Sequence, residues 1–275
     1  MLRFPLAAAL VAALALPVPA AAELLVAPTR VVLTPETRAA ELVLVNKGTE
    51  TAAFRIGIEN RRMNPDGSLE DAPQAQDGEL FADDKLRYSP RQLVLEPGAR
   101  QVVRIMASAP GDLAPGEYRS HLRLMSAPVS AASAAPAAAG QQPADNSLSI
   151  ELVAIRSITI PVILRVGKLE ASVTMDGAAL AKDAPEQLTV RLTRAGTRST
   201  YGDLSLTPEG AKEPAWVVRG VAIYTPNTAR DVIVPLPPEV RAALAGRQVR
   251  IDYTSTDAAD PASAGKRLAT LTARL

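Results

Sequence analysis

The sequence predicts an all-β protein made of two β-sandwich domains, and three observations lead to this fold class. Apolar residues alternate with small or polar ones in short segments such as residues 53–58, a period of two that is typical of half-buried strands. Turn-forming Asn-Pro and Pro-Gly pairs stand between these segments, and the chain contains 23 prolines among 275 residues. We expect at most one short helix, at residues 237–245. Short strands separated by turns favour a sandwich or a barrel.

The first half of the chain carries a series of short strand patterns, each bounded by turn chemistry. A turn signal at residues 46–48 ends one strand, and a Pro-Gly turn at residues 97–98 joins two strands into a hairpin. The next strand is entered through a second Pro-Gly pair at residues 115–116. The strands predicted here are residues 31–33, 41–45, 53–58, 92–95, 101–106 and 117–125.

A new β pattern begins after Gly167, and we therefore divide the chain there. The predicted domains cover residues 23–166 and 167–275, which are ordinary domain sizes. Within the first domain, residues 126–147 consist almost only of Ala, Ser, Pro and Gln, so we expect a flexible loop. The strands predicted in the second domain are residues 186–192, 216–223, 231–235, 248–253 and 268–273.

The longest apolar strand pattern follows the predicted loop, at residues 148–164. Leu148, Ile150 and Leu152 share one face of this strand, because alternate residues of a strand point the same way. At about 3.3 Å per residue the segment would span roughly 55 Å, which is much longer than an ordinary strand. We expect part of it to project beyond its sheet or to bend. Pro161 cannot donate to a strand ladder and predicts an edge or a bulge.

The composition excludes several classes of function. The chain has no cysteine and one histidine, so it can hold no disulfide, no zinc–thiolate site and no site built on two histidines. Its 30 Lys and Arg residues balance 29 Asp and Glu residues, and only 3% of its residues are aromatic, which argues against binding to nucleic acid. No catalytic or phosphate-binding motif occurs. We expect no cofactor, no metal and no enzymatic activity, and a structural role for His121.

The N-terminal residues 1–22 predict a cleaved signal peptide. A short positively charged start precedes the apolar run 6–16, and the small residues Ala20 and Ala22 form an A-x-A-like cleavage site. The alternative is a membrane anchor, which needs about 20 apolar residues, whereas this run is short and Pro17 and Pro19 break the apolar stretch at its end. We expect a mature chain that starts at Glu23, does not insert into a membrane and resides in a bacterial periplasm.

The first half is similar to the N-terminal domain of PapD-like periplasmic pilus-assembly chaperones of the chaperone–usher pathway. The resemblance covers roughly residues 24–166, and its most specific block is residues 88–98, with a Pro, a short strand and a Pro-Gly turn, followed by Val-Arg-Ile at 103–105. The second half shares with the family its β character, position and size. The matching stretches, in order, are residues 28–31, 41–46, 58–60, 88–98, 101–105, 116–119 and 122–123.

The resemblance implies a fold, a mechanism and partners. Family members are two immunoglobulin-like domains arranged as an L, and they bind pilus subunits that lack the last strand of their own sandwich. The chaperone lends a strand to this groove, caps the subunit and delivers it to an outer-membrane usher; self-association can cap the strand when no subunit is bound. Backbone pairing and alternate apolar side chains make this contact. Here the resemblance implies a donor strand carrying Leu148, Ile150, Leu152 and Ala154.

The resemblance also implies an anchor for the carboxylate at the C-terminus of the subunit. Family members hold it with two basic residues between the domains, and Arg30 matches the first. The second is a Lys, but alignment on the end of the strand places Pro161 there, so we assign this role to Arg156. Three further arginines are alternatives for the second base: Arg119, Arg123 and Arg165.

A second interpretation of the whole chain stays open. In it the protein is a secreted immunoglobulin-like structural or adhesive module without chaperone activity. Leu148, Ile150 and Leu152 would then be ordinary core residues, and Arg30 an exposed strand charge.

Overall fold

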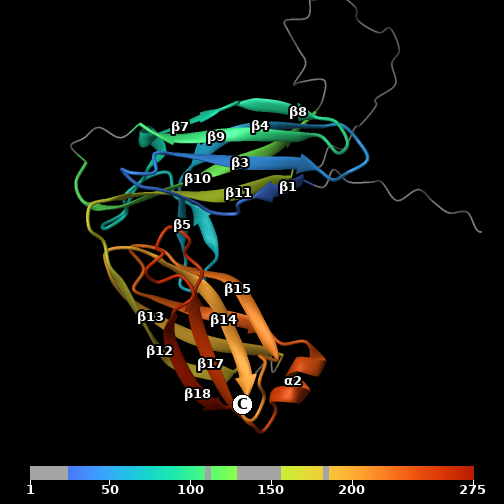
Figure 1. The fold of residues 1–275 in the computed structure, drawn as a ribbon, viewed down its shortest axis with the longest axis vertical. Helices are drawn as coiled ribbons and strands as arrows, with labels where there is room; N and C mark the ends of the chain where they lie inside the picture. The colour runs from blue at the N-terminus through green and yellow to red at the C-terminus, as the bar shows by residue number, and fades with distance from the viewer. Residues whose placement is uncertain (1–23, 109–112, 129–155, 182–185) are drawn as a thin grey trace, which may run out of the picture.

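The computed structural model describes residues 24–108, 113–128, 156–181 and 186–275. The predicted signal peptide and the donor-strand residues Leu148, Ile150, Leu152 and Ala154 lie outside the described residues, as does most of the predicted loop. The described strands form two sandwiches at a steep angle to each other (Figure 1). The predicted all-β class is therefore confirmed.

The first sandwich packs a four-stranded sheet against a five-stranded one. The strand orders are β1-β3-β9-β7 and β2-β11-β10-β4-β8. The strands are β1 (Leu24–Ala27), β2 (Val31–Leu33), β3 (Ala39–Asn46), β4 (Ala52–Glu59), β7 (Leu86–Ser89), β8 (Gln92–Leu95), β9 (Arg100–Ala107), β10 (Gly116–Ala127) and β11 (Ser157–Val166), with a 3₁₀ turn, η1 (Asp83–Lys85), before β7. Leu33, Leu42, Leu44 and Leu122 are completely buried between the two sheets.

The first strand pattern of the chain divides between these two sheets. β1 pairs with β3, whereas β2 pairs in parallel with β11, with Val31 opposite Val162. Because β2 pairs only with Val162–Leu164, the earlier residues of β11 have β10 as their one strand partner among the described residues. Pro161 lies in this half-paired stretch, opposite His121, which explains how a residue without a backbone N–H is accommodated.

The second sandwich has its own core and joins sheets with the orders β12-β13-β16 and β15-β14-β17-β18. Leu188, Leu204 and Tyr253 are fully buried in it, and the Tyr253 hydroxyl donates to the carbonyl of Val221 at 2.9 Å. Its elements are β12 (Ala171–Leu180), β13 (Gln187–Gly196), β14 (Thr200–Pro208), β15 (Trp216–Ile223), β16 (Ala229–Pro235), α2 (Pro238–Leu244), β17 (Gln248–Ser255) and β18 (Arg267–Arg274). The helix α2 lies within the range predicted for it, and no helix in the described part of the chain is long and apolar enough to cross a membrane.

A hairpin of the first domain reaches onto the second domain. It is formed by β5 (Arg61–Met63) and β6 (Leu69–Asp71). The carbonyl of Met63 accepts a hydrogen bond from Asn227 Nδ2 at 2.8 Å, and the carbonyl of Pro65 accepts one from the backbone N–H of Asp231 at 2.8 Å. Gly67 turns the hairpin with a φ of 88°, and a Cβ there would lie 2.1 Å from Arg230 Cζ. The positive φ therefore favours glycine, and any larger residue would also displace the Arg230 guanidinium.

A small apolar cluster completes the contact between the domains. Met63 and Ile163 of the first domain are buried against Ala222 and Tyr224 of the second. Ile163 lies on β11, on the face of its sheet opposite to the core of the first domain, because its neighbours Val162 and Leu164 point into that core. One face of β10 and β11 therefore meets the second domain, and the other face fills the first sandwich.

We predict that Leu122→Ala lowers the free energy of unfolding by about 2–5 kcal/mol, because it removes a completely buried side chain from β10 and leaves a cavity. Urea unfolding followed by circular dichroism measures this change. Val94→Ala is the control, since Val94 is 45% exposed and should change stability by less than about 0.5 kcal/mol. Equal effects of the two substitutions would contradict the burial of Leu122.

Candidate functional site

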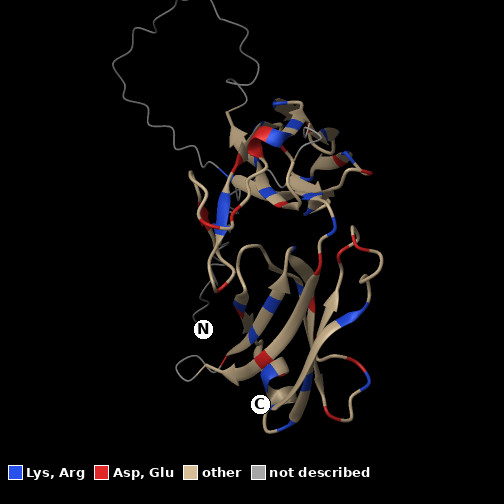
Figure 2. Ribbon diagram, turned by 90° about the vertical axis from the view of Figure 1, so that its left-hand side faces the viewer, with Lys and Arg blue, Asp and Glu red and all other residues tan. Residues whose placement is uncertain are grey.

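A groove with a volume of about 680 Å³ lies between the two domains. One wall is the corner between β1 and β2, which includes Pro28, Arg30 and Val32. The other wall is Tyr201 at the start of β14 and the loop after β17, which includes Asp257. Charged residues of both signs are interspersed along both domains (Figure 2).

Arg30 reaches from the first domain into the second. Its side chain is only 7% exposed, and its Nη1 donates to Asp257 Oδ1 at 2.9 Å. Its Cζ lies 4.7 Å from the centre of the Tyr201 ring, a cation–π contact. The Nε and Nη2 atoms of Arg30 are buried and have no hydrogen-bond partner among the described residues. Arg30 is therefore not an exposed strand charge, and it retains two unused donors.

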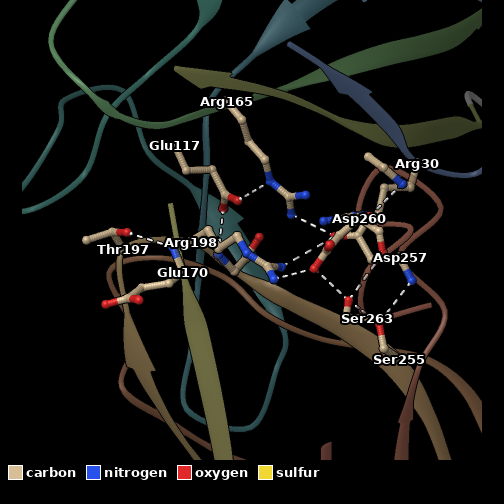
Figure 3. A network of polar contacts seen from close by, with 12 residues as sticks. Arg30, Glu117, Arg165, Glu170, Thr197, Arg198, Ser255, Asp257, Asp260 and Ser263 are labelled. Carbon is tan, nitrogen blue, oxygen red and sulfur yellow. Dashed lines mark hydrogen bonds and ion pairs between the residues drawn. The ribbon is translucent and has the colours of Figure 1, made fainter. Parts of the chain in front are cut away.

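A buried ion network connects Arg30 with the strands of the first domain (Figure 3). Arg165 on β11 donates from Nε to Glu117 Oε2 at 3.0 Å and from Nη2 to Asp257 Oδ2 at 2.8 Å. Glu117 lies opposite Arg165 on β10, and its Oε1 accepts the backbone N–H of Ser199 in the second domain at 3.0 Å. The chain Glu117–Arg165–Asp257–Arg30 therefore crosses the domain interface twice.

The surroundings keep Asp257 ionised. Burial alone would raise the pKa of Asp257, but the charges of Arg30 and Arg165 and their hydrogen bonds outweigh it and hold this pKa below its ordinary value. Burial likewise would lower the pKa of Arg165, but Glu117 and Asp257 raise it. The loop that carries Asp257 is held beside these groups by a second pair, between Asp260 and Arg198.

Arg119 and His121 lie on the same face of β10, and both are buried. The Arg119 Cζ lies 4.4 Å from the centre of the Tyr224 ring, and its Nε and Nη1 have no partner among the described residues. Both ring nitrogens of His121 likewise lack partners there. Burial, followed by the charges of Arg119 and Arg61, lowers the pKa of His121 to about 3. The imidazole is therefore neutral at physiological pH.

The structure does not bring Arg156 to Arg30. Arg156 is exposed, and its backbone N–H donates to Ser126 Oγ at 2.7 Å. It lies six positions before Val162, the residue opposite Val31, and six extended residues span about 20 Å. Arg123, another alternative, is paired with Glu59 at 3.3 Å.

Among the described residues, the groups that converge on Arg30 include two that sequence reasoning missed. Asp257 follows Arg30 by 227 positions, in a loop without any motif. Glu117 lies in a predicted strand, where its alternation with Arg119 is a signal that both share one face, but not that the face is buried. In the described part of the chain, no group of three or more His, Cys, Asp or Glu residues could hold a metal ion.

We predict that the stability of the protein falls as the pH is lowered from about 6.5 toward 3, because of His121. The folded state holds this imidazole neutral down to a pKa of about 3, whereas the unfolded chain takes up a proton near pH 6.5. His121 is the one histidine of the chain, so His121→Asn should flatten the loss between about pH 7 and pH 5. Urea unfolding at a series of pH values tests this, and parallel pH profiles of the two proteins would contradict it.

No family model and no curated protein matches the chain. Several solved structures are similar to the chain. A chain of the CsuC–CsuE chaperone–tip adhesion subunit pre-assembly complex from the archaic chaperone–usher Csu pili of Acinetobacter baumannii is 12% identical, with a TM-score of 0.47, over 91% of this chain and 98% of that one. The CupB2 chaperone of Pseudomonas aeruginosa is 13% identical, with a TM-score of 0.42, over 91% of this chain and 100% of its own.

A third similar structure holds the SafA pilin of Salmonella enterica in complex with the SafB chaperone. The matching chain is 13% identical, with a TM-score of 0.42, over 93% of this chain and 97% of that one. Each of these three matches covers at least 91% of this chain.

Proposed function

We propose that this protein is a periplasmic chaperone that binds, caps and stabilises pilus subunits by donor-strand complementation and delivers them to an outer-membrane usher. The observation that carries the proposal is Arg30, which lines the interdomain groove and whose buried Nε and Nη2 have no hydrogen-bond partner among the described residues. A buried guanidinium with free N–H groups is suited to a carboxylate, because the planar fork of an arginine can hold both carboxylate oxygens. A subunit has such a group at its C-terminus.

We assign the donor strand to the residues that lead into β11. Leu148, Ile150, Leu152 and Ala154 are alternate residues of the chain, and β11 begins at Ser157, shortly after Ala154. A subunit strand that pairs here would gain main-chain hydrogen bonds, while the apolar side chains fill successive pockets. Each buried Leu or Ile would contribute roughly 1.5–3 kcal/mol. The edge of β11 before Val162, which β2 leaves unpaired, is where we expect the subunit strand to pair.

For the second basic residue of the anchor, the structure favours Arg119 over Arg156. Arg30 immediately precedes Val31, so it is beside Pro161 and, one strand further, His121. Arg119 follows on the same face of β10, is buried, and has no hydrogen-bonded carboxylate among the described residues. Arg165, by contrast, is already paired with two carboxylates. We propose that Arg30 and Arg119 share the subunit carboxylate and that Arg156 contacts the subunit at the other end of β11.

We further propose that residues 1–22 direct the chain to the periplasm and are removed there. An apolar edge strand without a partner invites aggregation, so we expect the free protein to cap its donor strand by self-association until a subunit binds. The partners in this proposal are therefore a pilus subunit, an outer-membrane usher and a second copy of the chain.

We predict that Arg30→Ala abolishes the recovery of a co-expressed pilus subunit with the tagged protein from the periplasm, because the subunit carboxylate loses its principal anchor. Arg104→Ala is the matched control, since Arg104 lies in the same domain, forms an ion pair with Glu41 and is 63% exposed. Control and wild type should recover the same amount of subunit. Unchanged recovery with Arg30→Ala would contradict the assignment of the anchor.

We predict that Ile150→Asp abolishes subunit capture and leaves the thermal unfolding of the free protein unchanged, because a charge cannot enter an apolar pocket of the subunit. The control is Ser149→Asp, which places the same charge on the opposite face of the strand. If Ile150→Asp instead unfolds the protein, Ile150 is a core residue and the secreted-module interpretation is correct.

A further inference from the structure

Arg30 belongs to the first domain, but both groups that hold its guanidinium belong to the second. Asp257 accepts its Nη1, and the Tyr201 ring lies against its Cζ. The carboxylate of Asp257 therefore binds the guanidinium through a hydrogen bond, while the Tyr201 ring lies against one of its faces. Two contacts from different directions restrict how this side chain can turn.

The hydrogen bond to Asp257 uses only one edge of the guanidinium. A guanidinium offers five N–H groups in a fixed fork, and Nε and Nη2 present parallel N–H bonds along its side. These are the two atoms of Arg30 that have no partner among the described residues. Asp257 thus occupies Nη1, and the buried, unpartnered Nε–Nη2 edge has the geometry to bind a second carboxylate with two hydrogen bonds once the groups that cover it move aside.

Asp257 is itself fixed by several partners. Its side chain is 2% exposed; Oδ2 accepts Arg165 Nη2 at 2.8 Å, and Oδ1 also accepts the backbone N–H of Ala259 at 3.2 Å. Arg165 is in turn held by Glu117 at 3.0 Å. Because Asp257 cannot follow Arg30, Arg30 must adopt the orientation that Asp257 dictates.

We propose that Asp257 is a positioning residue of the carboxylate anchor: from the second domain, it orients Arg30 of the first so that the free Nε–Nη2 edge faces the C-terminal carboxylate of the bound subunit. Carboxylate recognition then requires both domains to be docked, even though the donor strand lies in the first domain alone. This inference rests on the proposed chaperone function and extends it to a residue that does not touch the subunit.

The experiment measures the carboxylate-dependent part of binding. The probe is an N-terminally fluorescein-labelled peptide of alternating valine and threonine residues, prepared with a free C-terminal carboxylate and as the C-terminal amide. Fluorescence anisotropy gives the ratio of the two affinities for the full mature chain and its variants. Asp257→Asn removes the charge that holds Arg30, whereas Asp260→Asn makes the same change three residues further along the same loop, where the partner is Arg198. Arg30→Ala defines the ratio without an anchor.

We expect the wild type to bind the free acid about tenfold or more tightly than the amide, as charge-assisted hydrogen bonds allow. Asp257→Asn should reduce this ratio toward that of Arg30→Ala, with little change in affinity for the amide, and should have no further effect in the Arg30→Ala background. Asp260→Asn should keep the wild-type ratio. A residue with a merely structural role would weaken both peptides equally.

Two outcomes would overturn the positioning role. A wild-type ratio in Asp257→Asn means that Arg30 needs no orientation from Asp257, and an increased ratio means that Asp257 competes with the subunit carboxylate for Arg30. If Asp257→Asn does not fold, Tyr201→Leu removes the other second-domain contact of Arg30 without changing any ion pair. A wild-type ratio of acid to amide affinity in Tyr201→Leu would then contradict the positioning of Arg30 by the second domain. Equal affinities of the wild type for acid and amide would instead refute the proposed anchor itself.

Discussion

The arrangement of the two domains depends on the buried bridge Glu117–Arg165–Asp257. Arg165 is the central cation, and it satisfies one carboxylate from its own sandwich and one from the other. Charges that are removed from water are costly unless each is paired and hydrogen-bonded, so this bridge tolerates little displacement. A rotation of one domain would leave Asp257 or Arg165 buried without its partner. The bridge therefore selects one relative orientation of the domains, and apolar packing around Ile163 and Tyr224 is added to it.

The groove is a consequence of that orientation. Arg30 would be an ordinary charge at a strand corner if the first domain stood alone, because Asp257 and Tyr201 both come from the second domain. Contact between the two domains buries the guanidinium of Arg30. Only its Nη1 atom then has a hydrogen-bond partner among the described residues, whereas Nε and Nη2 have none. The resulting unused donors are energetically unfavourable in the free protein, and a ligand carboxylate would remove that penalty. In the function that we propose, the contacts that stabilise the interface thus also prepare Arg30 to bind a carboxylate.

Prolines and short pairings determine which strand edges stay available. Pro161 cannot donate a backbone hydrogen bond, and β2 begins its pairing with β11 only at Val162. Among the described residues, no strand other than β10 pairs with β11 before that point, so an additional strand could approach this edge without displacing one of them. On its other side the same strand is fully paired with β10, from Ser157 to Val166. The rigid half of β11 supports the half that we propose to meet the subunit.

The sequence by itself determined the β class, the short helix and the selection of Arg30 as a candidate site residue, because alternation, turn residues and a strand motif are local properties of the chain. Only the tertiary structure decided what surrounds Arg30. Asp257 lies 227 positions away, and no local pattern encodes a contact between two domains. Strand register also separates two of the candidates that we considered for the second base: pairing of β2 and β10 with β11 places Arg119 near Arg30 and Arg156 far from it. Burial likewise made His121 neutral, since desolvation depends on what packs over a side chain and not on its neighbours in the chain.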